Sequence, residues 1–152
     1  ELLSLIQDLE EEILLRNDEA NNSAEKLPVH LLVIDSIAAP TRRDFGADTA
    51  PKRVSMLIQI AQLLKRLASQ LQLAVVVINQ VGMDQQNGEV RAALGISWHH
   101  CLSARILMES ESQPENGSEI QFDRSRRTAT IVKSNVARNA CVTYKICHKG
   151  LI

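Results

Sequence analysis

The segment Leu31–Ser36, with the sequence Leu-Leu-Val-Ile-Asp-Ser, constrains the fold of this chain most strongly. Consecutive aliphatic residues are typical of a β-strand that is covered on both faces, as strands in parallel sheets are. Asp35 ends the aliphatic run, so we expect its carboxylate at the carboxyl end of the strand. Ligands of open α/β sheets collect at that edge. A carboxylate there can hold Mg²⁺, and the ion can bridge nucleotide phosphates.

This pattern resembles the Walker B strand of phosphate-loop NTPases. The alternative is that Asp35 only caps a turn or a helix. The phosphate-cradling loop of that class, Gly-x-x-x-x-Gly-Lys-Ser/Thr, does not occur in the 152 residues. We therefore expect the second half of a nucleotide-binding domain, or a relative that has lost the first half.

Length and composition indicate one soluble domain with a hydrophobic core, and we take residues 1–152 as part of a single domain. Aromatic residues make up only 3% of the chain, so Leu, Ile, Val and Ala must build the core. This favours helices packed on a parallel sheet. The net charge is −1, so any nucleic-acid contact must come from a local cluster. No apolar run approaches the roughly 20 residues of a membrane span, and we expect no membrane partner.

The cysteines and histidines do not form a recognisable metal site. Cys101, Cys141 and Cys147 lack zinc-ligand spacing, and we expect them to be small buried hydrophobic residues in a reducing compartment. His99 and His100 are adjacent, so their side chains point in different directions and cannot easily share one metal. The chain also starts without Met, which suggests an excised fragment or a processed product.

Hydrophobic periodicity predicts a βαβ unit in the first half of the chain. An amphipathic helix over residues 2–14 precedes strands at Val29–Asp35 and Leu73–Ile78. Between these strands, an apolar stripe at helical spacing predicts a helix from about Lys52 to Leu71. A helix between two wholly apolar strands requires that the strands be parallel and the crossover right-handed.

The remaining segments are predicted from turn residues and from alternation of polar and apolar residues. The predicted loops are Asn17–Lys26, Ser36–Lys52 and Val81–Leu94. A short segment, Gly95–Leu102, leads to a strand at Ala104–Met108, and a terminal hairpin has strands at Thr128–Val132 and Cys141–Cys147.

Gln80 follows the second predicted strand just as Asp35 ends the first. The tips of neighbouring parallel strands face the same crevice. A carboxylate can hold a metal there, while a neutral amide can donate to a phosphate without competing for the metal. Asp35, Ser36 and Gln80 are therefore our candidate nucleotide-binding residues, with Gln80 as the candidate catalytic residue. The alternative for Gln80 is an amide that ties down a turn.

Basic residues lie in the loops that follow the two strands. The first loop contains Arg42 and Arg43 and closes with Lys52 and Arg53, and the second loop offers Arg91. Cations on a flexible backbone at this edge of a sheet can follow phosphates, so these residues are our candidates for DNA binding. The alternative is a solvated basic surface paired with acidic residues of the same loop.

Several segments together resemble the RecA-like homologous recombinases, from Leu31–Pro40 through the helix opening at Arg53 to Ala74–Val81, Ala93–Trp98 and Arg105. The resemblance is strongest to the eukaryotic recombinase paralogues. Within them, the Ala-Ala-Pro turn and the Ala-Leu-Gly-x-x-Trp segment look most like the branch called X-ray repair cross-complementing paralogue 3. The likeness runs from about residue 29 to the end of the chain.

The resemblance implies a RecA-like ATPase core, in which a mostly parallel central sheet is flanked by helices and followed by a C-terminal β-hairpin. It implies that Asp35 lies near Mg²⁺ and ATP and that Gln80 senses the γ-phosphate. Residues Thr41–Pro51 and Val81–Leu94 match the first and second DNA-binding loops of the family. Lys133–Asn139 matches a segment that reaches a neighbouring subunit's nucleotide in relatives.

These features imply an ATP-dependent factor of homologous-recombination DNA repair. We expect the intact protein to bind ATP, Mg²⁺ and single-stranded DNA within a hetero-oligomer that contains a related recombinase paralogue, and to support recombinase filaments in the nucleus and also the cytoplasm. A companion chain or segment would supply the Walker A loop, without which we expect no DNA-dependent ATPase activity from this chain. The alternatives are a non-catalytic adaptor that uses the fold for protein contacts, and a bacterial or archaeal RecA-type ATPase with another role.

Overall fold

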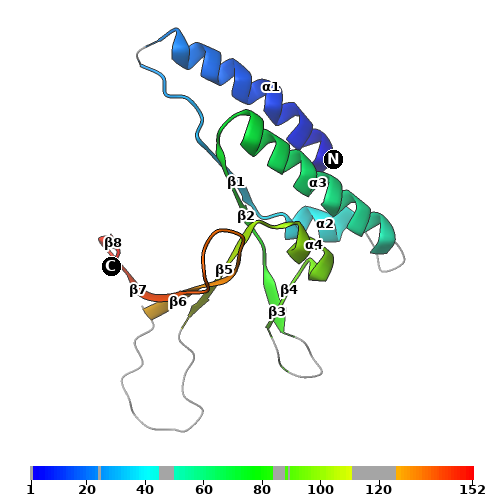
Figure 1. Cartoon of the computed structure of the whole chain (residues 1–152), viewed down its shortest axis with the longest axis vertical. Helices are drawn as coiled ribbons and strands as arrows, with labels where there is room; N and C mark the ends of the chain where they lie inside the picture. The colour runs from blue at the N-terminus through cyan, green and yellow to red at the C-terminus, as the bar shows by residue number, and fades with distance from the viewer. Residues whose placement is uncertain (1, 24, 45–49, 84–87, 89, 111–125) are drawn as a thin grey trace. The chain divides into compact units, whose positions relative to one another are not determined.

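The computed structural model describes residues 2–23, 25–44, 50–83, 88, 90–110 and 126–152. The chain divides into two compact units, Glu1–Cys101 and Leu102–Ile152. In chain order, the described elements (Figure 1) are α1 (Leu2–Asn21), β1 (Leu31–Asp35), α2 (Ala38–Asp44), α3 (Ala50–Gln70), β2 (Ala74–Ile78), β3 (Val81–Met83), β4 (Val90–Ala92), α4 (Gly95–Cys101), β5 (Ala104–Ser110), β6 (Arg126–Ser134), β7 (Cys141–Cys147) and β8 (Gly150–Leu151).

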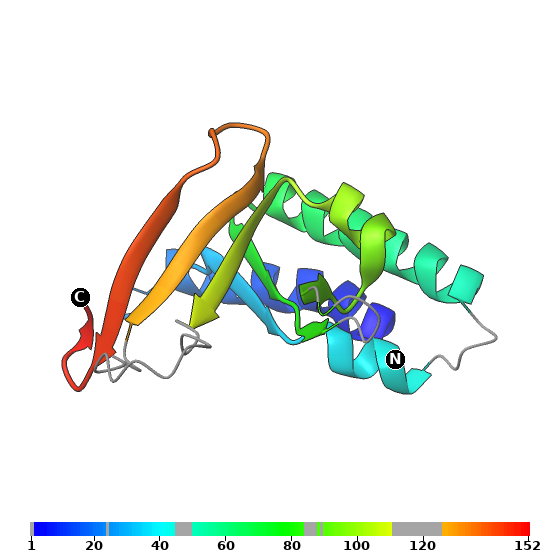
Figure 2. The same cartoon turned by 90° about the horizontal axis from the view of Figure 1, so that it is seen from below.

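Helix α3 supplies most of the core of the first unit. Its residues Leu57, Ile60, Leu64 and Leu67 recur every three or four positions, and each is 4% exposed or less. This spacing places them on one face of the helix. Helix α1 lies beside α3 in both views (Figures 1 and 2) and buries its own apolar residues, including Ile6. Of the apolar stripe predicted for α3, Leu57, Ala61 and Leu64 are confirmed as core residues, whereas Ile58 is 37% exposed; the buried Ile60 and Leu67 were not part of the predicted stripe.

Strands β1 and β2 form a parallel pair, as the predicted βαβ unit requires. The register runs from Leu31 opposite Ala74 to Asp35 opposite Ile78. At the start of the pair, the amide of Ala74 donates a hydrogen bond to the carbonyl of His30 over 2.8 Å. The predicted strands are confirmed with slightly shorter bounds.

Only one face of this parallel pair is covered in the described structure. Along both strands, half-buried residues alternate with exposed residues. On the open face, Leu31 is 55% exposed, Val33 50%, Val76 46% and Ile78 42%. Our prediction that both faces are covered is therefore wrong for the described residues, and four aliphatic side chains form an apolar surface.

All three segments that we predicted as loops contain regular structure. Residues Ala38–Asp44 form α2, and the buried Ile37, Ala38 and Thr41 explain why this segment folds against the core. Pro40 lies in the first turn, where its missing N–H costs nothing. Likewise, the first helix continues to Asn21, beyond its predicted end.

The segment predicted as a loop at residues 81–94 is a hairpin built from β3 and β4. The tip of this hairpin lies outside the described residues, as do parts of the predicted loop before α3 and the polar stretch before β6. After the hairpin, Gly95 has a φ of 72° at the start of α4. Only glycine adopts this conformation at little cost, which accounts for the glycine before Trp98.

The second unit is an antiparallel sheet with the strand order β5-β6-β7-β8 (Figure 2). The predicted terminal hairpin is confirmed as β6 and β7, whereas the two-residue β8 was too short to recognise. Among the described strands only β1 and β2 pair in parallel, so the mostly parallel sheet that we expected is wrong for this part of the chain. No described side chain of this unit is buried.

The cysteines are free and are less buried than expected. Cys101 and Cys147 are half-buried, and Cys141 is exposed. Their surroundings therefore do not match our interpretation as buried hydrophobic residues. Within the helices that the structure describes, none combines the length and apolar character needed to span a bilayer.

The core of the first unit predicts a large cost for truncation at α3. Leu67 is 0% exposed, so Leu67→Ala should lower the free energy of unfolding by about 2–5 kcal/mol, because it removes buried methyl groups and leaves a cavity. Leu15→Ala is the matched control: this side chain is 55% exposed and should lose less than about 1 kcal/mol. Urea denaturation measures both. Equal losses would contradict the core assignment.

Candidate nucleotide site at the edge of the parallel strands

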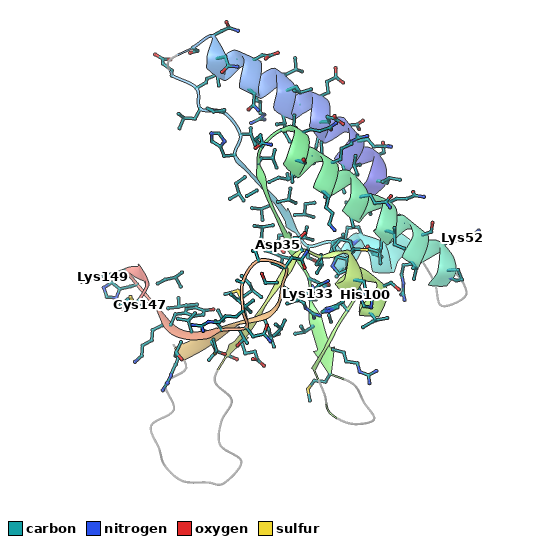
Figure 3. The ribbon with its side chains drawn as sticks, in the orientation of Figure 1. Asp35, Lys52, His100, Lys133, Cys147 and Lys149 are labelled. Carbon is teal, nitrogen blue, oxygen red and sulfur yellow. The ribbon has the colours of Figure 1, made fainter. Side chains whose placement is uncertain are left out.

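Parallel pairing brings the candidate nucleotide-binding residues to one edge of the sheet. Asp35 is the last residue of β1 and lies opposite Ile78, the last residue of β2. Asn79 and Gln80 follow directly. Figure 3 shows Asp35 at this edge, where its side chain is exposed. The peptide bond from Asp35 to Ser36 is cis.

The chain is firmly held where it leaves β1. The amide of Ile37 donates to the carbonyl of Ile78 over 3.3 Å, which extends the link between the two strands beyond Asp35. The buried hydroxyl of Thr41 donates to the carbonyl of Ile37 over 2.8 Å. Because Ile37 and Thr41 are both 0% exposed, the segment on either side of Ser36 has little freedom to move. Asp35 is thus an exposed carboxylate on a fixed backbone.

The donor set at this edge fits a magnesium–nucleotide complex. Mg²⁺ usually takes one or two carboxylates, retains several waters and binds substrate phosphates. Asp35 can supply the carboxylate, the hydroxyl of Ser36 is a further oxygen, and amide groups can donate to phosphate oxygens. No group of three or more potential ligands among His, Cys, Asp and Glu occurs in the described parts of the chain. An edge with one carboxylate suits a Mg²⁺ ion that phosphates help to hold.

Asn79 is a residue of this edge that our sequence analysis did not select. Its Oδ1 atom is buried and has no hydrogen-bond partner among the described residues. An unpaired buried acceptor lowers the free energy of unfolding by roughly 1–3 kcal/mol. The sequence does contain a signal for this residue, because Asn79 lies between an aliphatic strand and Gln80. We selected only Gln80, since one amide was enough to explain a polar residue at the end of that strand.

The β3–β4 hairpin begins directly at Gln80. The amide of Ala93 donates to the carbonyl of Gln80 over 2.9 Å and closes the base of the hairpin. Val81 then pairs with Ala92, and Gly82 pairs with Arg91. A shallow groove of about 630 Å³ follows the hairpin and is lined by residues that include Asn79, Gln80 and Arg91. The residue that follows the end of β2 therefore also forms the hydrogen-bonded base of the hairpin.

The structure does not gather the candidate DNA-binding residues at one place. Arg42 and Arg43 belong to α2, and Lys52 and Arg53 lie in the first turn of α3. Figure 3 shows Lys52 at the end of α3 that lies away from Asp35. Arg91 is exposed in β4, opposite Gly82. Arg91 lines the groove beside Gln80.

His99 and His100 form a packing contact at the end of α4. Their rings meet edge to face, with 5.7 Å between centroids. This geometry is typical of paired rings.

The unpaired Asn79 carbonyl predicts an unusual response to mutation. Asn79→Leu should leave the stability of the chain unchanged or raise it by about 1 kcal/mol, because the substitution removes a buried acceptor that has no partner. The smaller Asn79→Ala is the control for lost packing. Thermal denaturation measures both. A loss of more than about 1 kcal/mol in Asn79→Leu would show that the amide already has a donor in solution.

Comparison with known proteins places the chain in a family. Residues 7–151 match the Rad51 family. The chain is 32% identical over 110 residues to "DNA repair protein RAD51 homolog 4" of Bos taurus, covering 72% of this chain and 32% of that protein. It is 28% identical over 162 residues to "DNA repair protein XRCC3 homolog" of Arabidopsis thaliana, covering 86% of this chain and 53% of that protein.

A third relative, "DNA repair protein RAD51 homolog 3" of Cricetulus griseus, is 29% identical over 124 residues, covering 80% of this chain and 30% of that protein. The chain thus spans between 30% and 53% of the length of these relatives. The family match covers nearly the whole chain, including both strand tips and the hairpin. This chain belongs to the Rad51 family, with a RecA-like fold similar to the RAD51 paralogues and XRCC3.

Proposed function

We propose that the intact protein is an ATP-dependent factor of homologous-recombination DNA repair that binds ATP, Mg²⁺ and single-stranded DNA within a hetero-oligomer. The observation that carries this proposal is the edge where Asp35 and the Asn79-Gln80 pair end adjacent parallel strands, with an ordered hairpin starting at Gln80. The relatives named as DNA repair proteins support the same conclusion.

Each residue of the edge has a distinct role in this proposal. Asp35 holds Mg²⁺, directly or through water, and Ser36 adds an oxygen beside it. The Gln80 amide donates to the terminal phosphate, and it does not compete for the metal because it is neutral. The Mg²⁺–ATP complex, when bound, supplies the phosphoryl group that is transferred to water. The buried side-chain carbonyl of Asn79 accepts a hydrogen bond from a donor of the assembled site.

The hairpin links the nucleotide edge to DNA. Its base is fixed by the Ala93–Gln80 hydrogen bond, so a new contact at the Gln80 side chain would reorient β3 and β4 together. Arg91 on this hairpin contacts the phosphates of single-stranded DNA. The basic residues of α2 and of the first turn of α3, Arg42, Arg43, Lys52 and Arg53, supply further phosphate contacts in the assembly.

Further polypeptide completes the site in this proposal. The uncovered face of β1 and β2 exposes Leu31, Val33, Val76 and Ile78, which is an apolar surface suited to burial. A companion segment or chain with the phosphate-binding loop covers this face, and a related recombinase paralogue is the hetero-oligomeric partner. The site of action is the nucleus, and also the cytoplasm.

A non-catalytic assembly subunit is the second candidate function. Arg91 is the only cation that the structure describes on the β3–β4 hairpin, and the chain as a whole carries a net charge of −1. Both observations favour protein contacts over DNA contacts. In this alternative the nucleotide stabilises an interface and is not hydrolysed as part of a cycle.

The metal role predicts a specific loss on Asp35→Asn. In the intact protein, the affinity for ATP in the presence of Mg²⁺ should fall roughly 10- to 100-fold, because a charged contact contributes about 1.5–3 kcal/mol. Asp8→Asn, an exposed carboxylate on α1, is the control and should have no effect. Isothermal titration calorimetry with and without Mg²⁺ measures the difference. Unchanged affinity and hydrolysis in Asp35→Asn would exclude the metal role.

The DNA role predicts a salt-dependent contact through Arg91. Arg91→Gln should reduce the slope of log affinity for single-stranded DNA against log salt by about 0.7, the contribution of one phosphate contact. Arg16→Gln on the exposed face of α1 is the control and should leave the slope unchanged. Fluorescence anisotropy of a labelled oligonucleotide gives both slopes. No binding at low salt would favour the assembly subunit.

A further inference from the structure

One side-chain atom at the edge of the parallel strands is buried without a partner. In the part of the chain that the structure describes, this atom is the Oδ1 atom of Asn79. The buried hydroxyl of Thr41 shows the usual arrangement, since it donates to the carbonyl of Ile37 over 2.8 Å. Nearly all buried polar groups are hydrogen-bonded, so the exception at Asn79 has a cause or a use.

Alternation along the chain separates this carbonyl from the Gln80 amide. In β2, half-buried residues alternate with exposed residues, and the last residue, Ile78, is exposed. Asn79 is half-buried and continues the face of Val77. Gln80 is exposed and continues the face of Ile78. The amide that we assign to the phosphate and the unpaired carbonyl therefore have different surroundings.

Hydrogen bonds hold the backbone on both sides of Asn79. Before it, the carbonyl of Ile78 accepts from the amide of Ile37 over 3.3 Å. After it, the carbonyl of Gln80 accepts from the amide of Ala93 over 2.9 Å, a contact that we call the hairpin base. Ile37 is 0% exposed, whereas all of β3 is exposed, so the hairpin base is the contact with more freedom to open.

Closing the hairpin base carries an energetic penalty at Asn79. The closed base keeps the Oδ1 atom away from water, and no donor replaces the water. An open base lets water reach this atom, because Asn79 lines the shallow groove along the hairpin. The desolvation of one unpaired acceptor favours opening by roughly 5- to 150-fold, compared with a side chain that has no acceptor.

We propose that Asn79 is a positioning residue that keeps the hairpin base close to a local opening equilibrium, and that a hydrogen bond to its side-chain carbonyl closes the base. This role rests on the proposed function only for the source of the donor, which the assembled nucleotide site supplies. Local openings of this kind require less free energy than global unfolding and can couple one site to another. The order of the hairpin therefore depends on whether Asn79 is paired.

Amide hydrogen exchange of the whole chain without nucleotide, followed by NMR, tests this role. The amide of Ala93 reports on the hairpin base. The amides of Ile37 and Ala74 are controls in the same molecule, because they form hydrogen bonds before Asn79 and at the start of the parallel pair. Circular dichroism verifies that each variant is folded.

Two substitutions remove the acceptor and one retains it. Asn79→Leu should slow the exchange of Ala93 by roughly 5- to 150-fold and change Ile37 and Ala74 less than about twofold. Asn79→Ala adds no volume and should also slow Ala93. Asn79→Asp keeps an acceptor oxygen and adds a charge whose burial costs more, so it should speed the exchange of Ala93 at pH 7.

The matched control is Asn22→Leu, the same substitution at an exposed asparagine after α1. It should leave the exchange of Ala93 unchanged, since Asn22 bonds the carbonyl of Asp18 and not the strand edge.

Either of two results would overturn the proposal. Unchanged or faster exchange of Ala93 in both Asn79→Leu and Asn79→Ala would show that the carbonyl imposes no cost on the closed base. An equal change at Ala93 and Ala74 would show that the substitution alters global stability and not the hairpin base.

A second measurement separates this role from the proposed function. In the intact protein, ATP with Mg²⁺ should slow the exchange of Ala93, and it should do so less in Asn79→Leu, where the base is already closed. If ATP fails to bind while the variants still differ without nucleotide, the nucleotide site fails and the opening equilibrium at Asn79 is kept. If ATP binds but Asn79→Leu exchanges like the unmodified protein, the role of Asn79 alone fails.

Discussion

The parallel pairing of β1 and β2 is the constraint on which the candidate site depends. It aligns five residue pairs from Leu31–Ala74 to Asp35–Ile78, so both strands end at the same level. The Ile37–Ile78 hydrogen bond prolongs this alignment past the strand ends. A shift of register would separate Asp35 from the Asn79-Gln80 pair and move the base of the hairpin, because β3 begins at the next residue.

The two units achieve their folds by different means. The first buries aliphatic residues of α3 against α1, and the buried start of α2 fixes the chain after Asp35. The second is ordered by its antiparallel ladders, and none of its described side chains is buried. Apolar faces stay open in both units, which is consistent with a protein that functions with further polypeptide around it. Charge is also unevenly distributed, since the last strands contain cations and no carboxylates.

The sequence predicted the helices and strands that have a clear hydrophobic pattern. The apolar stripe from Val54 to Leu71 identified α3, although not all of its core residues, and aliphatic runs identified β1 and β2 together with their parallel pairing. The sequence could not reveal α2, because proline and arginines near a strand end are equally typical of a loop, and burial of Ile37 and Thr41 is a tertiary effect. The β3–β4 hairpin is a local pairing, but the Gly, Asp, Gln and Asn residues of this segment are equally typical of a loop. The burial of the Asn79 carbonyl is again a tertiary effect.

The central claim is that Asp35 and Gln80 act at one nucleotide site, and a double-mutant cycle tests it most directly. Asp35→Asn, Gln80→Ala and the double variant of the intact protein are compared for ATP affinity with Mg²⁺. If both residues contact the same magnesium–nucleotide complex, the effects should be non-additive by about 0.5–3 kcal/mol. Effects that add within about 0.3–0.5 kcal/mol would contradict the account, because independent sites behave in that way.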